Sequence, residues 1–268
     1  MLIQTFTIVL NYVKKWFIAN DNGCIEVLIA IFKVMVIRMN ENVLNYKKES
    51  AKLFERWKNT ELHKENVFIK DGIVCPETWF NSDKRPLYLL KEAYGGNDDW
   101  NLIDDYLTKN DNINSVTWRR VSLWSKGILK TSKDHLEVFN PEDEELHKFN
   151  NKYLRNIAVI NVKKSGGQKS SSYDEIIEYA KKDKECLLKQ LNICDPNIII
   201  CGYTISALKE ILGYDIKAVN NNHLYYFSEL NGHSLIILDY WHPANQFPDI
   251  MNYYGLMHVY QQALIINR

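Results

Sequence analysis

The sequence predicts an α/β fold, a three-layer αβα sandwich with a mostly parallel central sheet and helices on both faces. Short apolar runs typical of buried strands alternate with longer stretches of helical periodicity. Such alternation is typical of parallel sheets. The 46% apolar and 12% aromatic residues exclude a disordered chain. A chain of 268 residues suffices for one large domain.

The first helical pattern covers residues 42–57, where apolar residues recur at helical spacing among charges. Residues 86–90 (PLYLL) form a short apolar run, and two glycines at 95–96 follow it. This combination predicts a buried strand that enters a tight loop. Further helical patterns cover residues 100–107 and 116–129.

A second buried strand is predicted over residues 156–162 (NIAVINV), followed by a loop over 163–172 (KKSGGQKSSS). Ser172 stands three residues before Glu175, which is the spacing of a capping box at a helix start. Apolar residues over 176–191 then form a helical stripe.

The last third of the chain continues the alternation. Residues 197–201 (NIIIC) predict a third buried strand, and residues 205–212 a short helix that ends at Gly213. Two more strands are predicted at 224–227 and 234–238, and a final helix at 253–266.

The N-terminal segment, residues 1–38, differs in composition from the rest. Its apolar runs, 2–13 and 25–37, are shorter than the roughly 18 residues of a membrane span, and no cleavage site follows a basic start. We therefore expect neither a membrane partner nor a signal peptide. Because a polar helical pattern begins after Met39, we predict that 39–268 is a single domain and that 1–38 is an N-terminal extension. The hypothesis is that Met39 is the natural start and that 1–38 is either a non-native upstream read-in or a loosely attached helix.

Charge and cysteine content narrow the function classes. The 33 Lys and Arg balance the 33 Asp and Glu, which excludes a uniformly basic protein that coats nucleic acid and a uniformly acidic mimic. The five cysteines are odd in number and include no C-x-x-C pair. This pattern indicates free thiols in the cytoplasm, with no metal site and no other cofactor.

Three polar residues follow predicted strands. Glu92 comes after the first, Asn161 lies at the end of the second, and His242 comes after the last. Ligands of parallel sheets bind beyond the carboxyl ends of the strands. We therefore expect a carboxylate, a carboxamide and an imidazole to meet at one edge, where they can orient water, pair with a base and stabilise a leaving anion.

Four motifs in order resemble those of the uracil-DNA glycosylase superfamily. Residues 89–95 (LLKEAYG) resemble the water-activating G-E-A-P-G loop of its iron–sulfur branch, and 161–164 (NVKK) resemble its N-V-x-K. Residues 188–212, which contain CDPNIIICGYTISALKEIL, resemble the strand-to-helix motif, and 242–244 resemble the H-P-A motif. The four cluster cysteines of that branch are lacking, so no iron–sulfur cluster is expected.

The resemblance implies a role for each matching residue. Glu92 would activate water, Asn161 would pair with the flipped base, and His242 would contact the departing base. Tyr94 and Gly95 would border the base pocket, and Gly95 replaces a bulky residue that excludes 5-substituted pyrimidines in strict uracil enzymes.

The remaining implied roles concern stacking and DNA contact. Trp118 is the candidate for stacking on the base, with Trp124 as the alternative. The candidates for contact with DNA are Lys163, Lys164 and Lys169 at phosphates, and Asn245, Gln246 and Phe247 as the wedge that fills the duplex.

Each of these residues also has an ordinary structural interpretation. A glutamate or a lysine in a loop is commonly solvated, an asparagine commonly bonds to its own turn, and a histidine before proline can be a plain loop residue. Tryptophans on a helical pattern are more often core.

The favoured hypothesis is a monofunctional DNA glycosylase, monomeric and cytoplasmic, that excises uracil or a modified pyrimidine from single- or double-stranded DNA. It would serve repair or defence against phage with modified DNA. One alternative is a catalytically inactive nucleic-acid-binding module, motivated by Lys91 and Tyr94 in the first motif. Another is an enzyme that acts on free nucleosides.

Overall fold

The computed structural model describes residues 22–167, 171–213, 216–218 and 224–267. The chain divides into two compact units, Met1–Asn45 and Tyr46–Arg268. Helix α2 (Asn22–Lys58) begins in the first unit and continues without a break through Met39 into the second. Within the described residues, no helix combines the length and the apolar character that crossing a membrane requires.

The second unit is built on a seven-stranded sheet in the order β2-β5-β3-β6-β9-β8-β7. The four central strands are parallel, whereas β2, β8 and β7 pair antiparallel at the edges. The strands are β2 (Gly72–Ile73), β3 (Pro86–Tyr94), β5 (Ala158–Gly167), β6 (Ile198–Gly202), β7 (Lys217–Ala218), β8 (Tyr225–Leu230) and β9 (His233–Tyr240). A separate parallel pair joins β1 (Ile69–Lys70) to β4 (Trp100–Asn101).

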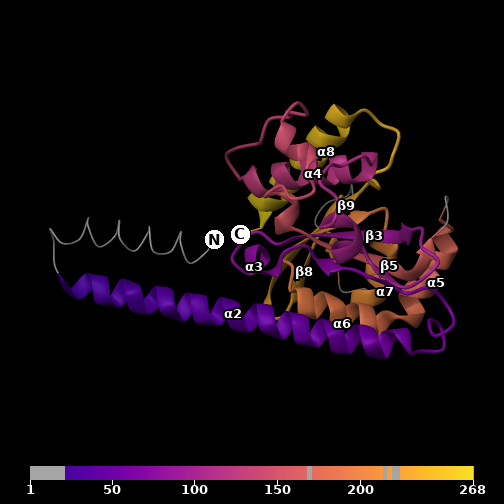
Figure 1. The fold of residues 1–268 in the computed structure, drawn as a ribbon. Helices are drawn as coiled ribbons and strands as arrows, with labels where there is room; N and C mark the ends of the chain where they lie inside the picture. Colours follow the sequence, from indigo (N-terminus) through magenta and orange to yellow (C-terminus); the bar gives the residue numbers. More distant parts are fainter. Residues whose placement is uncertain (1–21, 168–170, 214–215, 219–223, 268) are drawn as a thin grey trace. The chain divides into compact units, whose positions relative to one another are not determined.

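Helices cover both faces of the sheet (Figure 1), as expected for the predicted αβα sandwich. Helices α4 (Val116–Lys130) and α8 (Asp249–Ile266) pack on one face. The opposite face carries α5 (Tyr173–Lys182), α6 (Lys184–Cys194), α7 (Ile205–Leu212) and residues 46–58 of α2. The shorter elements are α3 (Pro76–Trp79), η1 (Leu102–Leu107), η2 (Glu144–His147) and η3 (Leu154–Asn156).

Strand β3 shows how the sheet separates two hydrophobic cores. Its side chains alternate, so Tyr88 and Leu90 pack toward α4 and α8, whereas Leu87 and Leu89 pack toward the opposite helices. Burying each such side chain stabilises the fold by roughly 1.5–3 kcal/mol. A strand buried on both faces favours apolar residues at successive positions, which explains the continuous apolar runs in the sequence.

Most predicted elements are confirmed, and α7 has the predicted bounds. The Ser172 cap is also confirmed, because its Oγ accepts the Glu175 N–H at 3.4 Å. The predicted helix over 100–107 is wrong in its first two residues, which form β4. Asn101 then caps the π-helix η1 by accepting the N–H groups of Ile103 and Asp104.

The predicted loop after the second buried strand begins too early. Strand β5 continues to Gly167, five residues beyond the predicted end at Val162. Lys163 and Lys164 therefore lie within the strand, and both side chains are buried. Buried carboxylates compensate these two charges, as described below.

Candidate active site

A cavity of about 860 Å³ opens at the carboxyl ends of the parallel strands. It is lined from β3, β5, α4 and the loop after β9. Five of the predicted site residues line it: Glu92, Tyr94, Trp118, Asn161 and His242. The predicted convergence of a carboxylate, a carboxamide and an imidazole at one edge of the sheet is therefore confirmed.

Glu92 lies near the end of β3 and forms a buried ion pair with Lys163 of β5, with 3.1 Å between Oε2 and Nζ. Lys163 also pairs with Glu175 at 2.8 Å. Burial opposes the charge of Lys163, but the hydrogen bonds that it donates to Glu175 and Glu92 outweigh this effect and raise the pKa of Lys163. The cation therefore holds the Glu92 carboxylate in one position at the cavity wall.

Gly167, at the end of β5, allows the chain to approach Glu92 closely. A Cβ atom at this position would lie 2.7 Å from Glu92 Cγ and from the carbonyl oxygen of Ala93. Any larger residue would push the Glu92 side chain or the β3 backbone away.

Asn161 is held by Asp71, a buried residue just before β2 that the sequence analysis missed. One carboxylate oxygen of Asp71 accepts both the backbone N–H of Asn161, at 2.8 Å, and its side-chain Nδ2, at 3.1 Å. The other oxygen accepts Lys164 Nζ at 2.5 Å and Gln190 Nε2 at 2.8 Å. The carboxamide of Asn161 is thus fixed by Asp71, which does not itself line the cavity.

The prediction that Lys163 and Lys164 contact phosphates is wrong. Both are buried and ion-paired, and Lys164 also lies over the Trp57 ring at 5.2 Å. Burial lowers the pKa of Lys164, although Asp71 partly offsets this effect. Both ammonium groups therefore pair with buried carboxylates. Lys169, the third predicted phosphate contact, lies outside the described residues.

His242 faces the cavity from the loop after β9. Its Nδ1 accepts the backbone N–H of Ala244 at 3.1 Å, so the neutral ring carries its proton on Nε2. Burial, with the nearby charge of Lys91, lowers the pKa of His242 to about 4. Near neutral pH the residue is therefore an uncharged donor.

The two tryptophan candidates separate clearly. Trp118 lines the cavity and lies 6.4 Å from the Tyr106 ring, which lines it too. Trp124 is fully buried against Tyr240, at 5.5 Å between ring centroids, and does not reach the cavity. Trp118 is accordingly the candidate platform for a base, and Trp124 is a core residue.

Tyr94 lines the cavity, whereas Gly95, the next residue, is not among the lining residues. Gly95 has a φ of +95°, and a Cβ atom there would meet nothing within 4 Å. The glycine is thus required by its backbone conformation and not by crowding. Its carbonyl accepts Trp100 Nε1 at 3.2 Å, which fixes the turn.

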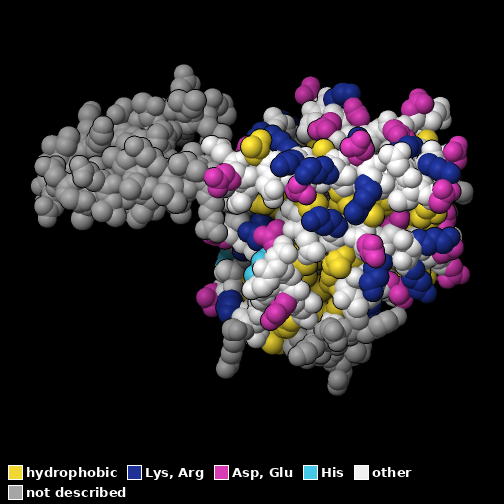
Figure 2. All heavy atoms as spheres, turned by 90° about the horizontal axis from the view of Figure 1, so that it is seen from below, with side chains coloured by type: hydrophobic (Ala, Val, Ile, Leu, Met, Phe, Trp, Pro, Cys, Tyr) yellow, Lys and Arg dark blue, Asp and Glu magenta, His cyan; other side chains and the backbone are white. Residues whose placement is uncertain are grey.

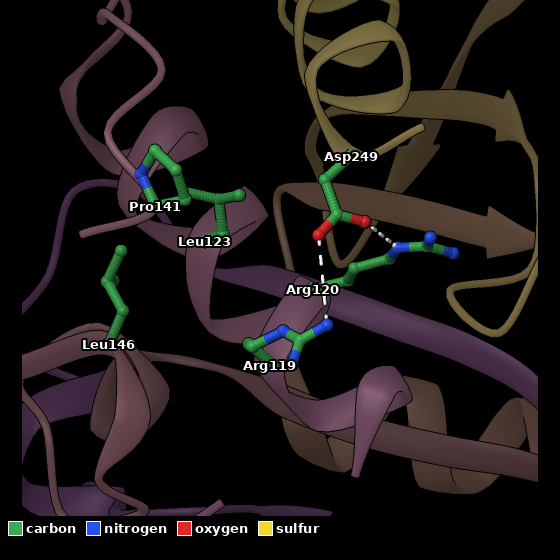
Figure 3. Close-up of a pocket in the computed structure, with 6 residues that line it drawn as sticks. All are labelled: Arg119, Arg120, Leu123, Pro141, Leu146 and Asp249. Carbon is green, nitrogen blue, oxygen red and sulfur yellow. Dashed lines mark hydrogen bonds and ion pairs between the residues drawn. The ribbon is translucent and has the colours of Figure 1, made fainter. Parts of the chain in front are cut away.

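Arg120 of α4, a second residue that the sequence analysis missed, holds the loop that carries His242. This buried guanidinium donates to the carbonyl oxygens of Pro243 and Phe247, both at 2.9 Å, and to that of Asn245. Its Nε donates to Asp249 at 2.6 Å (Figure 3). One side chain therefore fixes the loop through its backbone.

The predicted wedge residues differ in their surroundings. Phe247 and Gln246 are exposed. Asn245 is half-buried, and its Nδ2 donates to the His242 carbonyl at 2.9 Å and to Asn252 at 3.1 Å. Phe247 and Gln246 are thus placed to contact a partner, whereas Asn245 helps to shape the loop.

Within the described ranges, no group of three or more His, Cys, Asp or Glu side chains is placed to hold a metal ion.

A scan against protein-family models finds no match to the chain, and a sequence search of curated proteins finds none either.

Proposed function

We propose that the protein is a hydrolytic DNA glycosylase of the uracil-DNA glycosylase type that removes uracil or a modified pyrimidine. The observation that carries the proposal is the convergence of Glu92, Asn161 and neutral His242 on one cavity. Cleavage of an N-glycosidic bond needs help at the sugar, at the departing base and in recognition of the base, and these three residue types match these needs.

Glu92 acts at the sugar. Its carboxylate orients a water molecule toward C1′ and stabilises the positive charge that grows on the sugar as the base departs. General-base assistance of this kind accelerates a reaction by about 10²- to 10⁴-fold. The ion pair with Lys163 keeps the carboxylate in place while it acts.

His242 acts at the base. Its Nε2–H donates to a carbonyl oxygen of the base, where negative charge develops. Because the backbone N–H of Ala244 already occupies Nδ1, no reorientation of the ring is needed at the moment of reaction. Loss of one such fixed donor slows comparable reactions by about 10²- to 10³-fold.

Asn161 recognises the base. Asp71 accepts one of the two Nδ2–H groups, so a carbonyl oxygen and a second N–H can pair together with a Watson–Crick edge. Trp118 offers its ring face to the base, and Phe247 occupies the space that the base leaves. Extrusion of a base from a duplex costs a few kcal/mol, and these contacts offset that cost.

The test is a gel assay for abasic products on oligonucleotides that contain uracil, a mismatched pyrimidine or a 5-substituted pyrimidine. We expect base release by the wild type and a loss of at least about 100-fold in Glu92→Ala and in His242→Ala. Matched controls are Glu61→Ala and His147→Ala, which change exposed residues that do not line the cavity.

Two outcomes would contradict the proposal in different ways. Wild-type rates in both Glu92→Ala and His242→Ala would refute the site assignment. Absence of base release from every substrate would refute the activity. If a base is released, its mass separates repair of uracil from defence against phage with modified DNA.

One observation favours a second candidate, a nucleic-acid-binding module without catalysis. The Glu92 side chain is only 4% exposed and pairs with Lys163, which restricts the access of water to its carboxylate. This candidate predicts binding of DNA without an abasic product from any substrate.

A further inference from the structure

Three exposed aromatic side chains lie at the carboxyl ends of three neighbouring strands, at the edge of the sheet where the cavity opens. Tyr94 ends β3, whereas Tyr203 and Trp241 are the first residues after β6 and β9. They are 72%, 51% and 46% exposed. Strands β3, β6 and β9 are parallel neighbours, about 4.8 Å apart. Tyr203 and Trp241 leave the sheet at the same level, because Gly202 pairs with Tyr240. Tyr94 lies about three residues further along β3, because Leu89 pairs with Cys201.

Two further exposed aromatic rings and one lysine lie beside these residues. The Tyr173 ring lies 5.8 Å from Tyr203, and the Phe247 ring lies 5.3 Å from Trp241. Lys91, which lines the cavity, places its ammonium 4.8 Å from the centre of the Tyr203 ring. We call Tyr94, Tyr173, Tyr203, Trp241 and Phe247 the aromatic rim.

Tyr203 has a backbone conformation that aromatic residues rarely adopt. Its φ is +63°, in the left-handed region. Its N–H donates to the carbonyl oxygen of Tyr240 at 2.8 Å and approaches that of Cys201 at 2.9 Å, which ties the turn to β9. The fold thus maintains an unfavourable conformation to present a ring that it does not bury.

In the part of the chain that the structure describes, the cavity beside the rim holds little positive charge. Among the described residues that line the cavity, Lys91 is the only cation, and the two lysines expected at this edge are buried. The face on the side of helix α6, which is seen from below in Figure 2, carries interspersed basic and acidic side chains. Duplex binding depends mainly on Lys and Arg at phosphates, whereas single strands also bind by stacking their bases on aromatic rings.

We propose that the aromatic rim binds single-stranded DNA and that the substrate base is taken from a single strand. Bases that flank the target stack on Tyr94, Tyr203 and Trp241, and the target itself enters the cavity. A base in a single strand has no pairing partner to leave, which lowers the cost of extrusion. This inference rests on the proposed function for the role of the cavity, but binding can be tested without catalysis.

The test measures anisotropy of a fluorescent 15-nucleotide oligothymidine and of the same strand in a duplex with oligoadenosine. We expect the protein to bind the single strand at least 10-fold more tightly than the duplex. Trp241→Ala, Tyr94→Ala and Tyr203→Gly should each weaken it by about 5- to 150-fold, the equivalent of ~1–3 kcal/mol per stacked base. Glycine is chosen at position 203 because it adopts a positive φ without strain.

The matched control is Tyr254→Ala, which removes a partly exposed aromatic ring of α8 that does not line the cavity. It should bind like the wild type. Salt dependence provides a second measurement. With Lys91 as the one cation among the described residues that line the cavity, the slope of log K against log [salt] should be near −1, since each phosphate contact contributes about −0.7 for single strands.

The possible failures can be distinguished. Equal affinity for duplex and single strand, or wild-type affinity in all three rim variants, would overturn this inference even if uracil were excised. Rim-dependent binding of the single strand without base release would support it and refute the proposed function. If no DNA binds and Trp241→Ala abolishes self-association in sedimentation velocity, the rim is a protein-docking surface and the inference is wrong.

Discussion

The two sides of the cavity are held in different ways. On the strand side, Asp71, Asn161, Lys164 and Gln190 form a buried network in which side chains bond to side chains. On the loop side, Arg120 bonds mainly to backbone carbonyls of the segment after His242. The strand side therefore depends on the identity of each partner, whereas the loop side depends mainly on bonds to its backbone, from Arg120 and also from Asn245 and Asn252.

This difference has a consequence for what each side can do. A carbonyl oxygen is the same in every residue, so the exposed side chains of the loop can serve a partner without altering the shape of the loop. Trp241 and Phe247 are exposed on this side. Buried charges on the strand side are confined to structural and catalytic roles, because each must keep its counter-charge.

The largest expected effect is on the strand side. Asp71→Ala leaves the Lys164 ammonium buried without its carboxylate, and we expect a loss of ~3–5 kcal/mol in the free energy of unfolding, measured by urea denaturation. The double variant Asp71→Leu with Lys164→Met removes both charges and should recover most of this loss. A loss below about 1 kcal/mol in Asp71→Ala would show that the network does not stabilise the strand side.

On the loop side we expect a loss of both the proposed activity and stability. In Arg120→Met the backbone of residues 243–247 loses its anchor, and we expect a fall of about 10- to 100-fold in kcat/KM, as for a displacement of about 1 Å, with a loss of ~2 kcal/mol in stability. Arg119→Met is the control. It removes a neighbouring arginine that approaches the same Asp249 carboxylate, at 3.9 Å, but has an exposed side chain. Equal effects of the two variants would contradict the role of Arg120.

Sequence reasoning found the cavity but not the residues that support it. Glu92, Asn161 and His242 were predictable because the carboxyl ends of parallel strands meet at one edge. Asp71 lies 90 residues from Asn161, and Arg120 lies 123 residues from Pro243. No local pattern indicates such pairs, since they form only when the sheet assembles.

The error at Lys163 and Lys164 has the same origin. Two lysines before a Gly- and Ser-rich segment are typical of a solvated loop. Their burial depends on carboxylates elsewhere in the chain, Asp71 for Lys164 and both Glu92 and Glu175 for Lys163. Charge compensation across a sheet cannot be inferred from residue spacing.

A third prediction concerns ionisation, because the loop side keeps His242 neutral whereas the strand side keeps its charges paired. The pKa of His242 is about 4 in the folded protein and about 6.5 when unfolded. Its contribution to stability is therefore complete above pH 6.5 and is lost as the pH falls toward 4, by ~2 kcal/mol.

Two measurements test the ionisation of His242. The Cε1–H resonance of His242 in NMR should not titrate between pH 8 and 5. The difference in stability between wild type and His242→Gln should decrease as the pH falls from 6.5 to 4. A midpoint near pH 6.5 would instead show that the ring is solvated and charged in weak acid.

The smallest effect is expected at Asp239, a half-buried carboxylate near the end of β9 that has weaker compensation than those of the strand side. Burial raises its pKa to about 6, and Lys209 offsets this only in part. Because the folded pKa exceeds the unfolded value, the stabilising contribution is complete below about pH 4 and is lost as the pH rises through 6. Asp239→Asn should thus stabilise the protein by ~1 kcal/mol at pH 7 and leave its stability unchanged at pH 4. Thermal unfolding at both pH values measures this difference. Destabilisation by Asp239→Asn at pH 7 would mean that Lys209 compensates Asp239 as fully as Lys164 compensates Asp71, and the contrast between the two sides would then not extend to β9.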